Sequence, residues 1–506
     1  MSRKALAMFG ASARSVSAPI RNHDGYPAWE RPLEERYLQA LLCNTLGNTF
    51  YASASNLLAE TRAVHAEMML GDTAFAAKAI MYARMRGLMR TQPVYGLASL
   101  AGTDLARFRE AFDRVVLTPA DLADFTTMVK AQRRGEGGRA IKSIAGRRLL
   151  RLDEYRVIKY GAERADGGYA LRDLFRVHHP RAGRRLPLVD YLLGRADAAA
   201  LAALPQIRAL EDLKRATTDE AKVEAITRGR LPVEVASSFA GSSRAVWSAI
   251  VPQLPMLALV RHLATLERHG VLDEHRALLE SRFGDARAVQ RSRVLPFRFL
   301  EASRHVKSAW ARDALRDALE HAFGAVPSLH GRTVVCLDRS GSMGAYIQQA
   351  AIFALCALKK ARGDGRLLLF DDRLDELALS LRDSVLSQAE SIRVRGGTNH
   401  TLAVDELLRT RERVDSLVYV TDEQQNTGSP LLDRLDVYRR KVNADVKVFI
   451  VNVAPYVQSV APPHEKKTFH VFGWSDAVLS FLAMASRGFG SLVDVVRSGA
   501  WDVEVN

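Results

Sequence analysis

The sequence lacks the features that mark secreted or membrane proteins. It contains three cysteines among 506 residues, Cys43, Cys336 and Cys356, and they form no C-x-x-C pair. This argues against a disulfide-stapled fold or a zinc site and predicts a reduced chain in the cytoplasm. No apolar run reaches the roughly 18 residues of a membrane-spanning helix, so we expect no membrane segment.

Acidic residues are missing from the first 22 residues, which carry Arg3, Lys4, Arg14 and Arg21. An organellar transit peptide has such a composition. A frayed Ser/Ala-rich tail has the same composition, and chain ends are commonly frayed. We therefore interpret residues 1–22 as a flexible basic tail.

Positive charge is spread unevenly along the chain. There are 72 Lys+Arg and 57 Asp+Glu, a formal net charge of +15, but residues 331–506 contain 22 of each kind. The whole excess therefore lies in residues 1–330. Between Lys130 and Arg185, 16 basic residues accompany six acidic ones. Such a segment is typical of surfaces that bind a polyanion, although a solvated helix face has the same composition.

Apolar residues three and four positions apart dominate from Trp29 to about Phe323 and predict many short helices. Gly, Pro and short polar breaks separate them. Helical hairpins in series, without a fixed repeat length, predict an irregular α-solenoid. The clearest helical stretches are residues 33–46, 52–70, 73–90, 120–134, 245–270 and 308–323.

After residue 331 short apolar runs alternate with helical stretches. The runs are residues 333–338, 365–371, 415–422 and 446–453, and the helical stretches are residues 346–362, 401–413 and 430–442. Continuous apolar strands separated by helices predict a doubly wound α/β domain with a parallel sheet covered on both faces. We place a helical module at residues 23–326 and the α/β domain at residues 331–506. Ligands of such sheets bind beyond the carboxyl ends of the strands.

Oxygen-bearing side chains gather in sequence at those strand ends. The first strand runs into Asp338, Ser340 and Ser342 in a D-x-S-x-S pattern, Thr398 follows two glycines, and Asp422 ends a later strand. Hydroxyl and carboxylate oxygens suit a hard divalent cation, Mg²⁺ first, with Mn²⁺ or Ca²⁺ as alternatives. An N-capped turn would explain the D-x-S-x-S pattern alone, but not the two further elements. Asp371, Asp372 and Glu423 are interpreted as loop carboxylates, not ligands.

These five positions resemble the metal-ion-dependent adhesion site of von Willebrand factor A domains. The resemblance implies one open coordination position for an oxygen ligand from a partner. Asn399 stands where members of that family often carry Asp, so an auxiliary carboxylate is missing.

The helical half resembles the TROVE module of the Ro autoantigen and its bacterial relatives. The matching stretches, in order, are residues 24–26, 83–101, 138–145, 156–182, 244–263 and 295–302. A TROVE module followed by an A domain implies a ring of HEAT-like helical repeats closed by that domain. It implies binding of small noncoding Y RNAs on the outer surface and capture of misfolded RNA 3′ ends in a central hole. A tethered exoribonuclease such as polynucleotide phosphorylase is a further implied partner.

The resemblance also implies particular RNA contacts. Lys159 and His179 match family positions implicated in Y RNA binding, whereas Arg164 matches less well because this chain has extra residues between Tyr160 and Asp173. The remaining candidates are Arg139 and Lys142, which lie in a matching G-R-A-x-K segment, and Arg172 and Arg176, which charge and spacing suggest. We expect His178 and His179 to lie in a basic loop, not in a packed core.

The leading hypothesis is a monomeric, non-catalytic RNA-binding component of a ribonucleoprotein. Its contacts would be mainly to phosphates and RNA shape. The alternative is a metal-dependent protein-adhesion module with a basic helical scaffold. A metal-dependent hydrolase is disfavoured because no Ser/His/Asp or Cys/His set recurs near the strand ends.

Overall fold

The computed structural model forms two compact units, residues 1–89 with 326–506 and residues 90–325. It describes residues 20–43, 53–132, 137–162, 167–181, 183, 186–294, 296–324, 328–361, 365–378, 388–389, 391–463, 465–473, 476–487 and 491–502. Residues 1–19, most of the predicted basic tail, and Arg164 lie outside the described residues. None of the helices within the described ranges is long and apolar enough to cross a bilayer.

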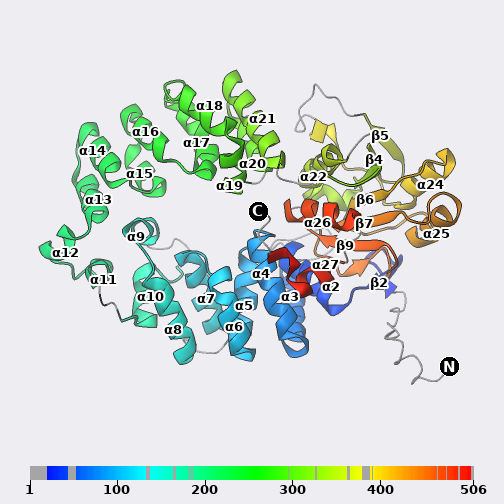
Figure 1. Cartoon of the computed structure of the whole chain (residues 1–506), viewed down its shortest axis with the longest axis horizontal. Helices are drawn as coiled ribbons and strands as arrows, with labels where there is room; N and C mark the ends of the chain where they lie inside the picture. Colours follow the sequence, from blue (N-terminus) through cyan, green and yellow to red (C-terminus); the bar gives the residue numbers. More distant parts are fainter. Residues whose placement is uncertain are drawn as a thin grey trace. The chain divides into compact units, whose positions relative to one another are not determined.

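The described residues of the unit 90–325 form helices joined by turns and loops and contain no strand, which confirms the predicted helical region (Figure 1). Neighbours along the chain pack against one another, as in α5 with α6, α13 with α14 and α20 with α21. The helices are α5 (Thr91–Thr103), α6 (Leu105–Val115), α7 (Pro119–Ala131), α8 (Gly138–Leu149), α9 (Glu154–Tyr160), α10 (Leu171–His178), α11 (Leu186–Leu192), α12 (Ala198–Ala202), α13 (Pro205–Arg215), α14 (Asp219–Gly229), α15 (Val233–Ala240), α16 (Arg244–Ile250), α17 (Met256–Arg268), α18 (Arg276–Gly284), α19 (Ala286–Ser292), α20 (Pro296–His305) and α21 (Ala309–Gly324).

The prediction of one helix over residues 245–270 is wrong. The structure divides it into α16, the 3-10 turn η2 (Val251–Gln253) and α17. Pro252 lies inside η2 and Pro255 is the N-cap of α17. Two prolines three residues apart remove backbone N–H donors and clash with the preceding turn, so a continuous helix cannot form there.

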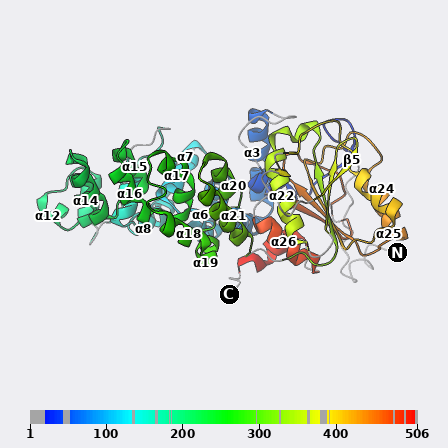
Figure 2. The same cartoon turned by 90° about the horizontal axis from the view of Figure 1, so that it is seen from above.

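The other unit contains the predicted α/β domain. Its six-stranded sheet has the order β5-β4-β3-β6-β7-β9, and every pairing is parallel except that of the edge strand β5 with β4. The strands are β3 (Thr333–Asp338), β4 (Arg366–Phe370), β5 (Leu374–Leu377), β6 (Ser416–Thr421), β7 (Lys447–Asn452) and β9 (Thr468–Phe472). Figure 2 shows α22 (Ile347–Lys360) on one side of the strands, and α24 (Thr401–Thr410) and α25 (Leu431–Lys441) on the other. Both faces of β3 are buried. Val334 packs against α24 and α25, and Val335, which points to the opposite face, is also inaccessible to solvent.

Residues near the N-terminus complete this α/β unit. β2 (Pro27–Glu30) pairs with β1 (Ile20–Arg21) on one side and with β8 (Gln458–Ser459) on the other. Helix α2 (Leu33–Cys43) packs against β9, and α27 (Leu492–Ser498) packs against α4 (Thr73–Met85). Helix α3 (Ala54–Gly71), which lies between α2 and α4 along the chain, packs on α2. Helix α26 (Asp476–Ser486) follows β9 along the chain. The unit is therefore assembled from both ends of the sequence.

Candidate functional site

The D-x-S-x-S turn begins where β3 ends. Asp338 is the last residue of β3, and its Oδ2 accepts a 2.6 Å hydrogen bond from the Thr421 hydroxyl at the end of β6. The Ser340 N–H donates to Asp338 Oδ1 at 2.9 Å, and the Ser340 and Ser342 hydroxyl oxygens lie 3.3 Å apart. The D-x-S-x-S turn and the end of the strand that precedes Asp422 therefore meet at the carboxyl edge of the sheet.

The Thr398 loop is hydrogen-bonded to both of these strand ends. The Gly341 N–H donates to the Gly396 carbonyl at 3.3 Å, which joins the loop to the D-x-S-x-S turn. The Thr398 N–H donates to Asn426 Oδ1 at 2.8 Å, and the Asn426 N–H donates back to the Thr398 carbonyl at 3.0 Å. Thr398 is buried. All five predicted metal-site residues thus belong to one set of connected loops.

The two carboxylates of the site are buried and repel one another. Burial raises the pKa of Asp338 to about 6. Burial, and next the nearby Asp338 carboxylate, raise the pKa of Asp422 to about 8. Asp422 Oδ2 is buried and has no hydrogen-bond partner within the described parts of the chain. A buried carboxylate in this condition holds a proton, as its raised pKa favours, or binds a cation.

The donor set fits a hard cation that accepts hydroxyl ligands. Across the described residues, no three His, Cys, Asp or Glu side chains gather as a metal-binding group. A cation at this edge would therefore depend on Ser340, Ser342 and Thr398 as well as on Asp338 and Asp422. Oxygen ligands of this kind suit Mg²⁺, which also retains water.

The other polar residues of the predicted motif have structural partners. Asn399 Oδ1 accepts hydrogen bonds from the Thr401 N–H at 3.0 Å and the Thr401 hydroxyl at 2.8 Å, so Asn399 shapes the start of α24. Asp371 is buried and accepts from the Nε atoms of Arg339 and Arg395, each at 2.7 Å. These contacts agree with its interpretation as a loop carboxylate.

A buried histidine behind the site was missed by the sequence analysis. His400 Nε2 lies 2.9 Å from the Thr421 hydroxyl oxygen. Because that hydroxyl donates its proton to Asp338, His400 Nε2 must carry the hydrogen and donate to Thr421. Burial lowers the pKa of His400 to about 4, so the ring is neutral at pH 7. The G-G-T-N-H spacing was the available signal, since it puts His400 two residues after Thr398.

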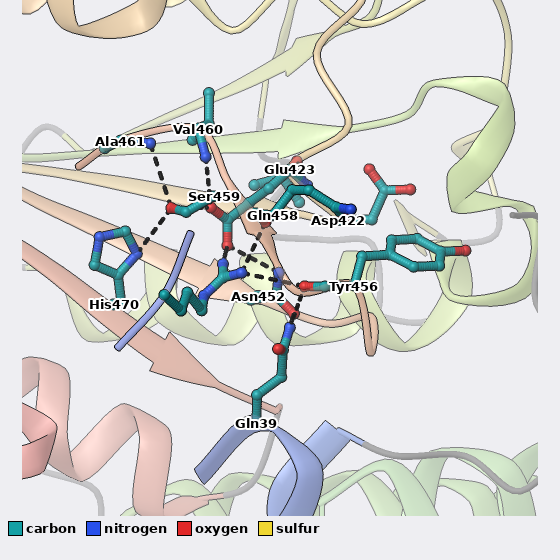
Figure 3. Close-up of polar contacts among 12 residues, drawn as sticks. Gln39, Asp422, Glu423, Asn452, Tyr456, Gln458, Ser459, Val460, Ala461 and His470 are labelled. Carbon is teal, nitrogen blue, oxygen red and sulfur yellow. Dashed lines mark hydrogen bonds and ion pairs between the residues drawn. The ribbon is translucent and has the colours of Figure 1, made fainter. Parts of the chain in front are cut away.

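An N-terminal strap, residues 20–31, packs on the loop that carries Asp422. Arg31 is buried, and its guanidinium forms an ion pair with the buried Glu423 and donates to the carbonyls of residues 456, 457 and 458 at 3.1, 3.1 and 2.7 Å. Glu423 also accepts from Asn452 Nδ2 at 2.8 Å and the Ser459 hydroxyl at 2.9 Å (Figure 3). Burial alone would raise the pKa of Glu423, but Arg31 and the other donors hold it below its usual value.

The same strap contacts the next three residues of the loop. Asn22 Nδ2 donates to the Gln425 carbonyl at 2.6 Å, and the His23 N–H donates to Gln424 Oε1 at 3.3 Å. The Asn426 side chain makes contacts at both ends of its amide. Its Nδ2 donates to Asp24 Oδ2 at 3.1 Å, and its Oδ1 accepts from the Thr398 N–H. The strap therefore fixes residues 423–426, directly after Asp422.

Five of the seven predicted RNA contacts lie on three helices of the other unit. Arg139 and Lys142 are on α8, and Arg172 and Arg176 are on α10, which packs against α8. Arg172 and Arg176 share one helix and one acidic neighbour, Asp173, at 3.8 and 3.6 Å.

Lys159 has a different environment. It is on α9, which packs against α13 and α15, and its Nζ forms a 2.7 Å ion pair with Glu234 on α15. Burial would lower the pKa of Lys159, but Glu234 raises it overall, so the lysine is charged at pH 7.

The two adjacent histidines separate in the structure. His178 is 3% exposed and contacts the Thr126 hydroxyl at 3.1 Å, so the expectation that it lies in a basic loop is wrong. It is the last residue of α10, where helical periodicity turns it inward. His179 is exposed and adopts a left-handed conformation with φ 43°, which ends the helix.

Comparisons with known proteins agree with these two units. The TROVE domain model matches residues 224–322, and the model of the VWA domain containing CoxE-like protein matches residues 300–455. The chain is therefore similar to a TROVE domain and, after it, to a VWA domain, in the order that the resemblance implied.

Related proteins extend this result over the whole chain. The chain is 26% identical to the RNA-binding protein RO60 of Deinococcus radiodurans, with 93% of this chain and 95% of that protein covered. It is also 26% identical to the RNA-binding protein RO60 of Caenorhabditis elegans over 54% of this chain and 47% of that one. The crystal structure of Deinococcus radiodurans RO (RSR) protein has the same fold, with a TM-score of 0.66 and 23% identity, and the match covers 90% of this chain and 100% of that one. These matches confirm the resemblance of the chain to Ro proteins.

Proposed function

We propose that this protein binds RNA as a non-catalytic component of a ribonucleoprotein. The observation that carries the proposal is the similarity, along 93% of the chain, to a protein described as RNA-binding. The exposed arginines of α8 and α10 supply the positive charge that phosphate contacts need. The role is RNA quality control, maturation or degradation.

We infer the RNA partners of this protein from its resemblance to Ro proteins. Structured RNA of the Y class binds the basic surface formed by Arg139, Lys142, Arg172, Arg176 and His179, together with Lys159. Single-stranded 3′ ends of misfolded RNA are captured separately, and an exoribonuclease such as polynucleotide phosphorylase acts on them. Arg164 stays a prediction because it lies outside the described residues.

A mobility-shift titration tests the basic surface. We expect a Y-like RNA to bind the full chain with an affinity that falls steeply between about 50 and 200 mM salt. Reversing the charge at Lys159, Arg172 and Arg176 should weaken binding strongly at the lower salt concentration. Unchanged affinity would remove these residues from the site.

The matched control is Arg316→Glu on α21. Arg316 and Arg176 each have a side chain that is 59% exposed and each pairs with an aspartate three residues earlier. Charge reversal at Arg316 should leave affinity nearly unchanged. An equal loss at both positions would mean that net charge alone, and not the proposed surface, determines binding.

We further propose that Asp338, Ser340, Ser342, Thr398 and Asp422 hold one divalent cation, Mg²⁺ in the first place. When bound, the cation neutralises the buried carboxylates and offers an open position to an oxygen ligand of a partner. Mg²⁺-dependent protein capture without any co-purified RNA would favour the adhesion function instead. The ratio of absorbance at 260 and 280 nm of the gently purified protein distinguishes the two functions.

A further inference from the structure

Two adjoining pockets in the helical unit share one wall, the side chain of Tyr169. The larger has a volume of about 660 Å³ and is also lined by Lys130, Asp173 and Arg176. The smaller has a volume of about 180 Å³ and is also lined by Tyr160. The larger volume falls in the range of small-molecule binding sites.

The smaller pocket offers aromatic and apolar surface. Tyr160 and Tyr169 are both half-buried, so each ring is held by packing and still presents surface to the pocket. Pro119, Ala120, Ala123 and Leu171 add apolar surface, and Arg90 also lines this pocket. Flat aromatic ligands bind such surroundings by stacking, and a nucleobase of any type has the required π face.

The larger pocket adds positive charge beside the same ring. Lys130 Nζ lies 6.0 Å from the centre of the Tyr169 ring. Arg176 lines the pocket, and Asp173 is an acidic neighbour that Arg176 shares with Arg172. One carboxylate against these cations leaves a positive surplus, which favours an anion next to the aromatic wall.

Gly167 and Gly168 leave the mouth of the larger pocket open. Both line it and neither carries a side chain, and Gly167 has φ +70°, a conformation that favours glycine. A ligand can therefore reach the Tyr169 ring from the surface. The glycines and Tyr169 belong to the stretch between Tyr160 and Asp173 in which this chain has extra residues.

We propose that these pockets form a nucleotide subsite for single-stranded RNA. One unpaired base stacks on Tyr169 in the smaller pocket, and the adjoining phosphate lies beside Lys130 and Arg176 in the larger one. The subsite rests on the proposed RNA-binding function and adds to it a position that reads unpaired nucleotides. Base-paired RNA gains nothing from it, because bases inside a duplex cannot expose a face.

Binding measurements on the full chain test the subsite. The probes are a fluorescent oligouridylate of about eight nucleotides and a blunt-ended, fully paired RNA duplex. Y169L should weaken oligouridylate binding by about five- to 150-fold, the effect of losing one base stack. Y169F should bind within about twofold of the wild type because the ring is kept. Duplex affinity should not change in either variant.

Tyr191→Leu is the matched control, since Tyr191 is a partly buried tyrosine of the same unit that lines neither pocket. Y169L and Y169F binding oligouridylate equally well, or Y169L weakening both probes equally, would overturn the subsite while leaving RNA binding intact. A wild-type chain that binds neither probe would refute the proposed function as well.

Photocrosslinking of the wild-type protein keeps the test independent of folding defects in the variants. Oligouridylate carrying 5-iodouridine should crosslink to the peptide that contains Tyr169. Crosslinks confined to other peptides would place the unpaired bases elsewhere and contradict the subsite.

Discussion

Replacing Arg31 by methionine should strongly destabilise the α/β unit. The Arg31–Glu423 pair is fully buried, with both side chains 0% exposed. Methionine fills a similar volume but removes the charge and the hydrogen bonds to three backbone carbonyls. It leaves the Glu423 carboxylate buried without its cation. Breaking one side of a buried ion pair in this way costs about 3–5 kcal/mol.

A double-mutant cycle separates the ion pair from packing. Glu423→Gln in the R31M background removes the unpaired charge but keeps a side chain that can accept from Ser459 or Asn452. We expect the free energy of unfolding of the double variant to be about 2 kcal/mol higher than that of R31M alone. The two side chains are then both neutral, so no unpaired charge is buried.

Urea unfolding measures these differences if the signal comes from the α/β unit alone. The five tryptophans are divided between the units, with Trp247 and Trp310 in the helical one. In a Trp247→Phe/Trp310→Phe background, fluorescence follows Trp29, Trp474 and Trp501. A loss below about 1 kcal/mol for R31M, the range of exposed ion pairs, would refute the reasoning.

Three further predictions concern charge elsewhere in the molecule. Without divalent cations, Asp422→Asn should raise the free energy of unfolding of the α/β unit by about 1–3 kcal/mol, because it removes one of two buried carboxylates. The same variant should lose the thermal stabilisation that Mg²⁺ gives the wild type. Thermal melts with and without EDTA measure both effects. Burial would raise the pKa of Asp72, but the Phe75 N–H and Arg497 lower it overall, so the carboxylate stabilises the fold at neutral pH and this contribution disappears as pH falls through the lowered pKa. Asp72→Asn should therefore cost about 0.5–1 kcal/mol at pH 7 and progressively less as the pH falls through the lowered pKa, by urea midpoints. Arg176→Ala should reduce the slope of log affinity against log salt by about one, by titrations at several salt concentrations.

Elements with a strong local pattern were predictable from sequence. β3 has the predicted bounds 333–338, because six apolar or strand-forming residues in a row fit a buried parallel strand. The edge strand β5, with the sequence Leu-Asp-Glu-Leu, has no apolar run, since an edge strand buries little. It forms because backbone groups of β4 accept an antiparallel partner.

Contacts between distant residues were beyond sequence reasoning. Glu423 was interpreted as a loop carboxylate, but nothing near it in the sequence indicates that its partner is Arg31, 392 positions away. Similarly, the sequence His178-His179 does not indicate which of the two rings is buried. In the structure the buried ring is that of His178, which packs against Thr126. Asp338 and Asp422, in contrast, stand at the ends of strands that the apolar pattern predicts, and ligands of such sheets bind at those ends.

The discontinuous α/β unit has a consequence for synthesis on the ribosome. Residues 20–89 precede residue 326, where the rest of the unit begins, by more than 230 residues. At about 5–20 residues per second, that interval lasts roughly 10–50 s, during which apolar residues of α2 such as Leu38 and Leu41 lack their final packing partners. The contiguous helical unit can fold within that time. Closure of the α/β unit therefore comes last, when the strap that was translated first finally meets Glu423.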